Sequence, residues 1–539
     1  MAASPPGVAL SQTPALTDVK ACEQWLAHAS LADPRQACQA LTTLLEELEE
    51  RPPHEAAHLE ILERLRDPIG IANTAHARKF TGRPLPLREQ EAQAFDEVFD
   101  LWTAYARGFR RLLRAAVESG EPAMRPHVGL LCERAASCTA ALITTHYRAR
   151  REVDSEHWQS LHELFRLADA EGVAAQAVPV KRRSTHMASL EQVYLRALLI
   201  ELANPYGLSA RDLQWTRRWA GLWAHKVDLG LSLPAPQGYA VDLAGESPPA
   251  WTRLDAAAPT LRFLDTSALR RSLKARVRKL EAGEDPVALG LGRDVIGEDA
   301  ARLLAQLLRA WTEPPTVRQF TRRIAPGRTE LIVGLDVIHA ACGGRLSRAA
   351  GGHWDYSRRD AEQIAIYGAV ADAGEANANP SFTAQKWDTL DESANGFKLR
   401  RKGGGERIAH RQLVAAKPQG ARAFILFEVR WLCVGIDRAL TIGAHALPGL
   451  AEPVSARPPW AGCGAPEPFV HAFLISSLPG GSPSLVLPAG RFQQGRELEL
   501  RVNDEVRRVR LDALLQHGAD FDRVAFTASD QERAAEAAS

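Results

Sequence analysis

Two short clusters of polar residues have the types and spacing that could bind an anionic ligand. Asp391, Ser393 and Gly396 form the pattern Asp-x-Ser-x-x-Gly between two alternating runs, KWDTL and GFKLRR. A carboxylate at a strand end can accept hydrogen bonds from the N1–H and N2–H₂ edge of a guanine. A glycine at that turn lets the backbone approach a ligand closely. This cluster therefore suggests one half of a nucleotide site.

The other half is predicted to come from arginines upstream. Arg318 and Arg322 have the spacing RxxxR, and Arg323 is adjacent. Arginine can donate in bidentate fashion to guanine O6 and N7 or to phosphate, and it can stack on a base. Each cluster also has a plain alternative: RxxxR is frequent in an arginine-rich chain, and DxSxxG is a common turn whose side chains bond their own backbone.

The elements that position these clusters are predicted to be β-strands of a small antiparallel barrel at 316–450. Short apolar runs there are separated by glycines and polar turns, as in closed β structures. A Gly/Ala/Asn-rich insertion, 343–380, interrupts the barrel and contains a short helical segment, RRDAEQIAIYG. The glycine-rich loop RRKGGGER is interpreted as a turn between strands. The six predicted β runs are TELIVGLDVIHAAC, FTAQKWDTL, GFKLRR, ERIAHRQLVAA, ARAFILFEVRWLCVGI and ALTIGAHAL.

The rest of the chain divides by composition and periodicity. Residues 1–17 are predicted to be a disordered tail. Residues 18–228 are predicted to be an all-α bundle or solenoid, because apolar residues recur there at intervals of three and four residues. An α+β connector is expected at 229–315, a Pro-rich linker at 451–468, a β-rich segment at 469–530 and a polar tail at 531–539. The helical runs are ACEQWLAHASL, QACQALTTLLEELEE, AAHLEILERLR, AFDEVFDLWTAYARGFRRLLRAA, WQSLHELFRLADAEG and LEQVYLRALLIELANP.

Composition excludes several classes of protein. The 66 Lys and Arg residues nearly equal the 65 Asp and Glu residues, so the formal charge is +1, which argues against a general nucleic-acid binder. The seven cysteines are scattered and form no CxxC, which predicts neither a disulfide framework nor a zinc ribbon and favours the cytoplasm. No apolar run is long enough for membrane insertion.

The segment HEAAH, His54 to His58, matches the spacing of zinc peptidases, with Glu55 as the general base. Pro52 and Pro53 directly precede it, so the two histidines are expected in the first turn of a helix. We interpret the segment as an amphipathic helix start and expect no metal and no catalytic residue. A zinc hydrolase stays the remote alternative.

The two clusters, in their order and places, resemble the PilZ domain family, the bacterial receptor module for cyclic di-GMP. The run AFILFEVRWLCVGIDRALTIGAHAL adds to the resemblance, since an Arg-Trp at a strand end is followed by a glycine in the next strand. The resemblance covers about 315–450. It implies that Arg318, Arg322 and Arg323 clamp phosphates and guanine edges, while Asp391, Ser393 and Gly396 complete the site. The insertion at 343–380 departs from the family's usual spacing.

The resemblance implies a cytoplasmic, non-enzymatic effector that binds cyclic di-GMP, as an intercalated dimer, without a cofactor. Its binding would be coupled to an unidentified protein partner through the helical domain, with motility, pili or biofilm as outputs. The helical region is similar to those of large proteobacterial PilZ-containing proteins. The alternative is a helical scaffold or adaptor whose barrel binds nothing.

Overall fold

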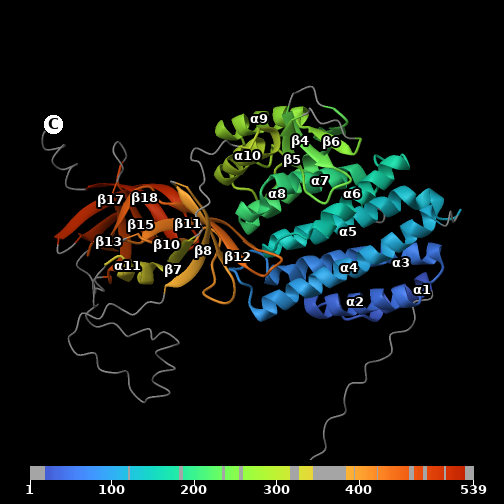
Figure 1. The fold of residues 1–539 in the computed structure, drawn as a ribbon, viewed down its shortest axis with the longest axis horizontal. Coiled ribbons are helices and arrows are strands. Elements are labelled where there is room, and N and C mark those ends of the chain that lie inside the picture. Colours follow the sequence, from blue (N-terminus) through green and yellow to red (C-terminus); the bar gives the residue numbers. More distant parts are fainter. Residues whose placement is uncertain are drawn as a thin grey trace, which may run out of the picture. The chain divides into compact units, whose positions relative to one another are not determined.

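The computed structural model consists of two compact units. One unit comprises 1–83, 87–318 and 433–436, and the other 84–86, 319–432 and 437–539. Within 18–528, the structure describes all residues except 119–121, 181–185, 233–236, 254–258, 316–326, 344–383, 394, 422, 461–466, 477–481 and 503–504. Helices make up most of the first unit and strands most of the second (Figure 1).

The first unit opens with eight α-helices, which confirms the predicted helical N-terminal region. They are α1 (Val19–His28), α2 (Pro34–Glu50), α3 (Glu55–His76), α4 (Glu89–Val117), α5 (Val128–Ala149), α6 (Ser155–Ala170), α7 (Leu190–Leu202) and α8 (Ala210–Trp223). Short 3-10 turns lie at Ala77–Lys79, Arg125–His127, Pro205–Gly207 and Ala224–Lys226, and a small hairpin pairs β1 (Val178–Pro179) with β2 (Met187–Ala188). Asp18, Asp33, Asp154, Ser189 and Ser209 cap helix starts by accepting backbone N–H groups.

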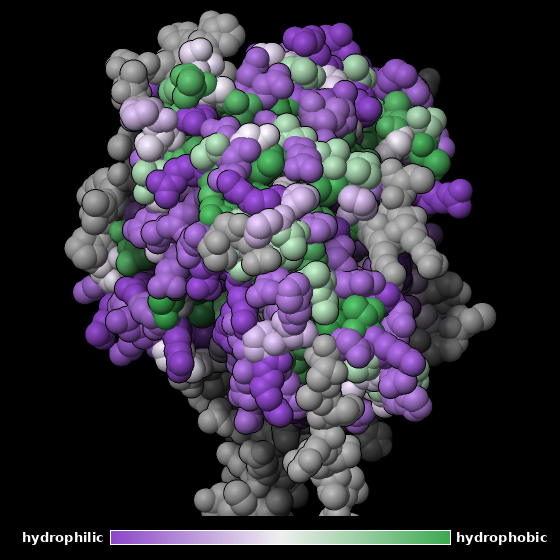
Figure 2. Space-filling model, turned by 90° about the vertical axis from the view of Figure 1, so that its right-hand side faces the viewer, coloured by the Kyte–Doolittle hydropathy of each residue, from purple (hydrophilic) through white to green (hydrophobic). Residues whose placement is uncertain are grey.

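Helix α5 is the centre of this unit and is absent from the six helical runs that the sequence suggests. It is buried on almost every side, so its apolar residues follow no amphipathic stripe. The outer helices α2 and α4 are amphipathic. Figure 2 shows one face of the molecule on which hydrophilic side chains predominate and hydrophobic ones form small groups. None of the helices in the described part of the chain is long and apolar enough to cross a membrane.

The predicted connector shares one core with the helices. A four-stranded sheet, in the order β3-β6-β4-β5, consists of β3 (Asp228–Gly230), β4 (Gln237–Asp242), β5 (Ala250–Arg253) and β6 (Leu261–Asp265). Helices α9 (Ser267–Glu281) and α10 (Gly297–Thr312) follow. The indole of Trp311 donates to Leu199 O at 2.6 Å, and that of Trp219 donates to Leu291 O at 3.0 Å. The connector is therefore packed into the helical unit.

The second unit contains the predicted antiparallel barrel. Its strands are β7 (Gly327–Val333), β8 (Gln385–Ser393), β9 (Gly396–Arg401), β10 (Leu413–Pro418), β11 (Ile425–Val434) and β12 (Leu440–Ala446). They close in the order β10-β11-β12-β9-β8-β7. A short helix, α11 (Leu335–Ala341), follows β7. The helical segment predicted inside the insertion falls outside the described residues.

The predicted β-rich segment is a second closed barrel. Its strands are β13 (Leu450–Arg457), β14 (Val470–Ser476), β15 (Ser484–Pro488), β16 (Glu497–Val502), β17 (Glu505–His517) and β18 (Phe521–Ala528). They close in the order β13-β14-β15-β18-β17-β16. If the strands of each barrel are numbered from one to six along the chain, both barrels have the same order around the ring, 1-2-3-6-5-4. The two barrels therefore share one strand topology.

Strand β13 corrects one prediction. Residues 451–457, which the composition assigns to a linker, form most of this strand. Pro453 has no N–H, which suggests a break in a sheet. In the structure Pro453 pairs only with Phe473 of β14, because β16 pairs with β13 from Ser455 onward. The missing donor therefore costs no hydrogen bond to β16.

Helix α11 and one buried acid lie where the two barrels pack together. A shared core joins residues of the first barrel, such as Leu426, to residues of the second, such as Phe521. The His339 ring of α11 stacks on His471 with centroids 4.2 Å apart, and its Nε2 bonds Val454 O at 3.0 Å. Glu428 of β11 is buried and accepts hydrogen bonds from Arg411, Arg430 and Gln516. The barrels thus form one packed pair.

Candidate functional site

The Asp-x-Ser-x-x-Gly cluster is the tight hairpin between β8 and β9. Ser393 pairs with Gly396, and Asp391 pairs with Lys398. A register shift between Thr389 and Asp391 inserts one extra residue in β8. Such a bulge changes which residues of a strand point outward. Here it puts Asp391 on the outer face, while Thr389 is buried inside the barrel.

Packing accounts for the glycine and the serine of this cluster. A Cβ on Gly396 would overlap the carbonyl oxygen of Ala444 in β12, so close strand approach requires glycine here. The Ser393 hydroxyl donates to the Gly396 carbonyl at 3.3 Å. Asp391 is half-buried beside them. Two of the three predicted residues therefore have a structural role within the hairpin itself.

Three outward side chains and one glycine form a row across four neighbouring strands, which we call the barrel row. It consists of Asp391 in β8, Lys398 in β9, Gly443 in β12 and Trp431 in β11. Asp391 pairs with Lys398, and Lys398 pairs with Gly443. A Cβ on Gly443 would overlap the indole of Trp431, so this ring lies directly across the glycine. The adjacent residues Leu399 and Ile442 point inward and are buried.

The barrel row offers two kinds of contact. The Lys398 ammonium lies 5.9 Å from the centroid of the Trp431 ring and forms no ion pair with any residue that the structure describes. An indole face beside a cation suits the stacking of a base and the binding of its phosphate. Asp391 adds a half-buried carboxylate to the same row. The sequence analysis does not predict Lys398 as a site residue, nor the place of Trp431 opposite Gly443. The signal for Lys398 is the alternation of side chains along the strand GFKLRR, which turns Lys398 outward.

Two arginines at the start of the glycine-rich loop between β9 and β10 bond to other residues of the barrel. The Arg401 guanidinium lies 4.6 Å from the centroid of Trp387 and donates to Gln385 and to the carbonyl of Glu406. Burial lowers the pKa of Arg401. Arg400 points outward and forms an ion pair with Asp437. These two cations are engaged within the barrel.

The predicted arginines Arg318, Arg322 and Arg323 lie outside the described residues. The structure thus brings Asp391, Ser393 and Gly396 together in one hairpin. The position of that hairpin relative to the three arginines stays a prediction.

The HEAAH segment starts helix α3, as its prolines predict. His54 is the exposed N-cap and accepts from the Ala56 N–H at 3.4 Å, whereas His58 is buried one turn on. Burial, followed by the field of Arg111, lowers the pKa of His58 to about 4. Among the residues that the structure describes, no group of three or more His, Cys, Asp and Glu side chains could hold a metal ion.

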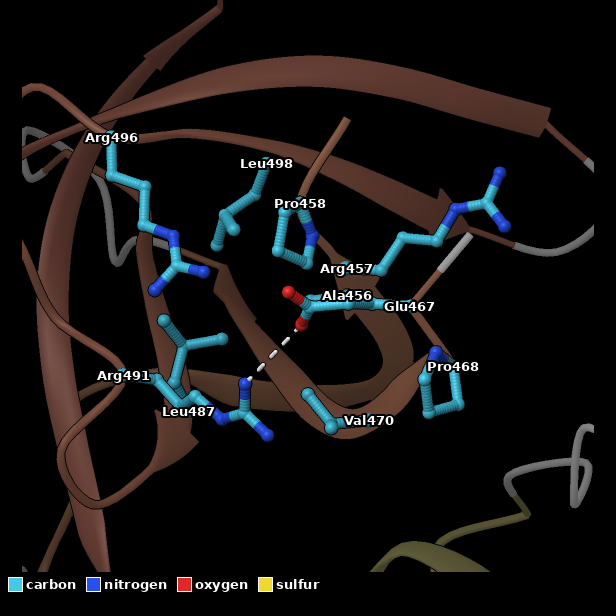
Figure 3. A pocket seen from close by; sticks show the side chains of 10 residues that line it. All are labelled: Ala456, Arg457, Pro458, Glu467, Pro468, Val470, Leu487, Arg491, Arg496 and Leu498. Carbon is cyan, nitrogen blue, oxygen red and sulfur yellow. Dashed lines mark ion pairs between the residues drawn. The ribbon is translucent and has the colours of Figure 1, made fainter. Parts of the chain in front are cut away.

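The second barrel has a small cavity at the end of β13 (Figure 3). Its volume is about 20 Å³, which is room for about one water molecule. Arg491 forms an ion pair with Glu467 at 3.6 Å across it, and the guanidinium of Arg457 turns away from it. The cavity is lined by Ala456, Arg457, Pro458, Glu467, Pro468, Val470, Leu487, Arg491, Arg496 and Leu498. It is too small for a nucleotide.

Two ranges of the chain match known protein families. Residues 20–235 match the family model described as "Cyclic-di-GMP receptor FimW, N-terminal domain", and residues 457–529 match "FimW C-terminal beta-barrel domain". These two parts of the chain are therefore similar to the two FimW domain models.

The FimW C-terminal match covers most of the second barrel, and residues 236–456 lie between the two matched ranges. A curated Pseudomonas aeruginosa protein named Cyclic-di-GMP receptor FimW is 24% identical over 332 residues. The match covers 60% of this chain and 53% of the relative. The chain therefore spans about half the length of the curated relative it matches.

Proposed function

We propose that the protein is a non-catalytic receptor for cyclic di-GMP and that the first barrel binds this ligand on its outer face. The observation that carries the proposal is the barrel row, where Asp391, Lys398 and Trp431 share one outward surface across four strands. A guanine stacked on the indole could donate its N1–H and N2–H₂ groups to the Asp391 carboxylate. Lys398 would neutralise a phosphate.

Chain connectivity supports a contribution from the predicted arginines. Strand β7 begins at Gly327, which pairs with Thr389, two residues from Asp391. The first residue of β7 therefore lies at the end of the barrel that carries the hairpin. Arg322 is five residues before Gly327, and a chain of five residues spans at most ~18 Å. We infer that Arg318, Arg322 and Arg323 clamp the phosphates and the Hoogsteen edges of guanine from that segment.

The FimW matches support the choice of ligand, because the matched N-terminal model and the curated relative are both named for a cyclic-di-GMP receptor. The barrel row lies between the two matched regions. The PilZ-type arrangement of this barrel is part of the proposal. It rests on the two motifs and on the closed six-strand ring.

The same geometry offers a route from ligand to output. The predicted arginines belong to the segment between α10, which ends at Thr312, and β7, which begins at Gly327. A ligand that binds these arginines would restrict that segment and favour one arrangement of it. The helical region would pass this change to a protein partner in motility, pili or biofilm regulation.

Calorimetric titration of the full chain with cyclic di-GMP tests the proposal. We expect saturable binding to the wild type, and weaker binding to Arg322→Ala. Arg491→Ala in the second barrel serves as the matched control and should bind like the wild type. If Arg491→Ala weakens binding and Arg322→Ala does not, the ligand binds the second barrel and the proposal is wrong.

A second candidate function is a helical adaptor whose first barrel binds nothing. It is favoured by the hairpin itself, since packing against Ala444 explains Gly396 and the backbone bond explains Ser393 without a ligand. Absence of any heat with wild-type protein, together with a normal unfolding transition, would favour the adaptor.

A further inference from the structure

Three arginines come from adjacent helices of the helical unit, in which α7 packs against both α5 and α8. Arg196 comes from α7, Arg217 from α8 and Arg148 from the last turn of α5. The stem of Arg196 crosses Gly221, because a Cβ on that glycine would lie 3.4 Å from Arg196 Cδ. Gly221 is one helical turn from Arg217, on the same face of α8. We call these three residues the arginine seam.

The seam is accessible and yet surrounded by protein. Arg196 is exposed, whereas Arg148 and Arg217 are half-buried. Desolvation nevertheless lowers the pKa of all three guanidinium groups, to about 9 for Arg217 and about 10 for Arg148. Arg196 and Arg148 both contribute to the lowering at Arg217. Desolvation thus disfavours the charged form of each guanidinium group.

Negative charge does not balance these cations. None of the three arginines forms an ion pair within the described residues, and the buried Nε of Arg217 has no hydrogen-bond partner there. Arg148 donates only to a neutral group, the Thr81 hydroxyl, at 3.0 Å. Glu133 is the acidic group whose field reaches Arg196, and its carboxylate is already bonded to Arg134 and Ser137.

Like charges that are partly removed from water without a counter-ion are costly unless a ligand supplies the opposite charge. Guanidinium forks match the oxygens of phosphate in bidentate fashion. We propose that the arginine seam binds a phosphate-bearing anion through Arg148, Arg196 and Arg217. This proposal uses no feature of either barrel and stands independently of cyclic di-GMP binding there.

Thermal unfolding of the full chain with sodium pyrophosphate or with sodium chloride at equal ionic strength tests the seam. We expect pyrophosphate to raise the unfolding midpoint of the wild type by about 2 °C or more beyond chloride. Arg217→Met and Arg196→Met should lose this gain. In chloride, Arg217→Met should unfold at a higher temperature than the wild type, since a repulsion has been removed.

Arg218→Met is the matched control on the same helix. Arg218 forms an ion pair with Asp294 at 2.7 Å, so its loss should lower the midpoint in chloride and keep the pyrophosphate gain. Equal gains from pyrophosphate in Arg217→Met and the wild type would overturn the proposal. So would a wild type that responds alike to both salts. Arg196 is exposed, so its variant provides a reading even if Arg217→Met folds poorly.

Titration of Arg217→Met with cyclic di-GMP identifies the source of the phosphate. An affinity equal to that of the wild type would assign the seam to another phosphate-bearing metabolite, and a weaker one would assign it to the dinucleotide. Arg322→Ala, measured in parallel, separates a failure of the seam from a failure of the barrel site.

Discussion

In both barrels the first three strands form one meander and the last three form another. The ring closes because strand three pairs with strand six and strand one pairs with strand four. Their outer surfaces differ. The first barrel has an indole beside a cation that pairs with no described acid. In the second barrel, Glu499 pairs with Arg457 at 2.9 Å and lies 3.9 Å from Arg508.

The hairpins at equivalent positions also differ. Between strands two and three the first barrel has DESANG, and the second has SSLPGGSPS, which contains no acid. Shared topology does not by itself imply shared function, because function depends on which side chains the ring presents. These differences favour the first barrel as the proposed ligand site.

The largest effect is expected from the arginines before β7. The double substitution Arg318→Ala/Arg322→Ala should abolish measurable binding of cyclic di-GMP, because each charge-assisted contact contributes on the order of 2 kcal/mol. Calorimetry on the full chain measures this loss. As a control, an arginine pair in the loop before β16 of the second barrel, Arg491→Ala/Arg496→Ala, should leave the affinity unchanged. Unaltered affinity in the first double variant would show that the arginines are misassigned.

The junction of the barrels should respond to acid. Burial, followed by the field of His471, lowers the pKa of His339 to about 4, and His471 also holds the pKa of Asp336 below its usual range. An unfolded histidine titrates near pH 6.5, so below that pH the unfolded chain binds the additional proton. The contribution of the neutral His339 to the free energy of unfolding is therefore fully present above pH 6.5 and is lost toward pH 4. The expected loss between pH 7 and pH 5 is about 2 kcal/mol.

Urea unfolding of the wild type and of His339→Gln at the two pH values measures this effect. The glutamine keeps a donor for Val454 O and does not titrate. The difference in the free energy of unfolding between the wild type and His339→Gln should therefore be smaller at pH 5 than at pH 7. If the difference stays constant with pH, the junction does not depend on a neutral His339, and the barrels cannot be treated as one acid-sensitive pair.

A smaller loss is expected when the stacking platform is removed. Trp431→Ala should weaken cyclic di-GMP binding by about 1.5 kcal/mol, the order of one base–aromatic stack. Trp460, which follows the first strand of the second barrel and is 55% exposed, provides the matched control. Trp460→Ala should bind as the wild type does. Equal losses in both variants would erase the distinction between the two barrels.

The smallest effect is expected from the acid of the barrel row. Asp391→Asn keeps an acceptor but loses its charge, so binding should weaken by roughly 1 kcal/mol. Asp388 is exposed on the same strand and pairs with Arg400 instead of Lys398. Titration calorimetry of Asp388→Asn is the control, and it should match the wild type. A larger effect at Asp388 than at Asp391 would move the site off the barrel row.

Residue patterns predict the order of the parts well, and local strand details poorly. Amphipathic helices such as α2 and α4 can be predicted because their apolar residues recur at intervals of three and four residues. The fully buried α5 does not, because it has no polar face. Strand β13 resembles a linker because of Pro453, and the absence of a second partner at that residue cannot be read from composition.

The candidate site divides in the same way. Asp391 and Ser393 are predictable as a polar turn after a strand. The bulge that turns Asp391 outward beside Lys398 depends on how β8 pairs with β9, and no local pattern specifies it. Gly443 is suggested only by resemblance, and the structure gives its physical reason, which is the indole of Trp431 lying across it.

A structure of the full chain bound to cyclic di-GMP tests the central claim most directly. The account predicts a guanine ring against Trp431, its edge at Asp391, and the phosphates between Lys398 and the arginines before β7. Density for the dinucleotide on the second barrel, or Arg322 bound on the side of the first barrel opposite Asp391, would contradict it.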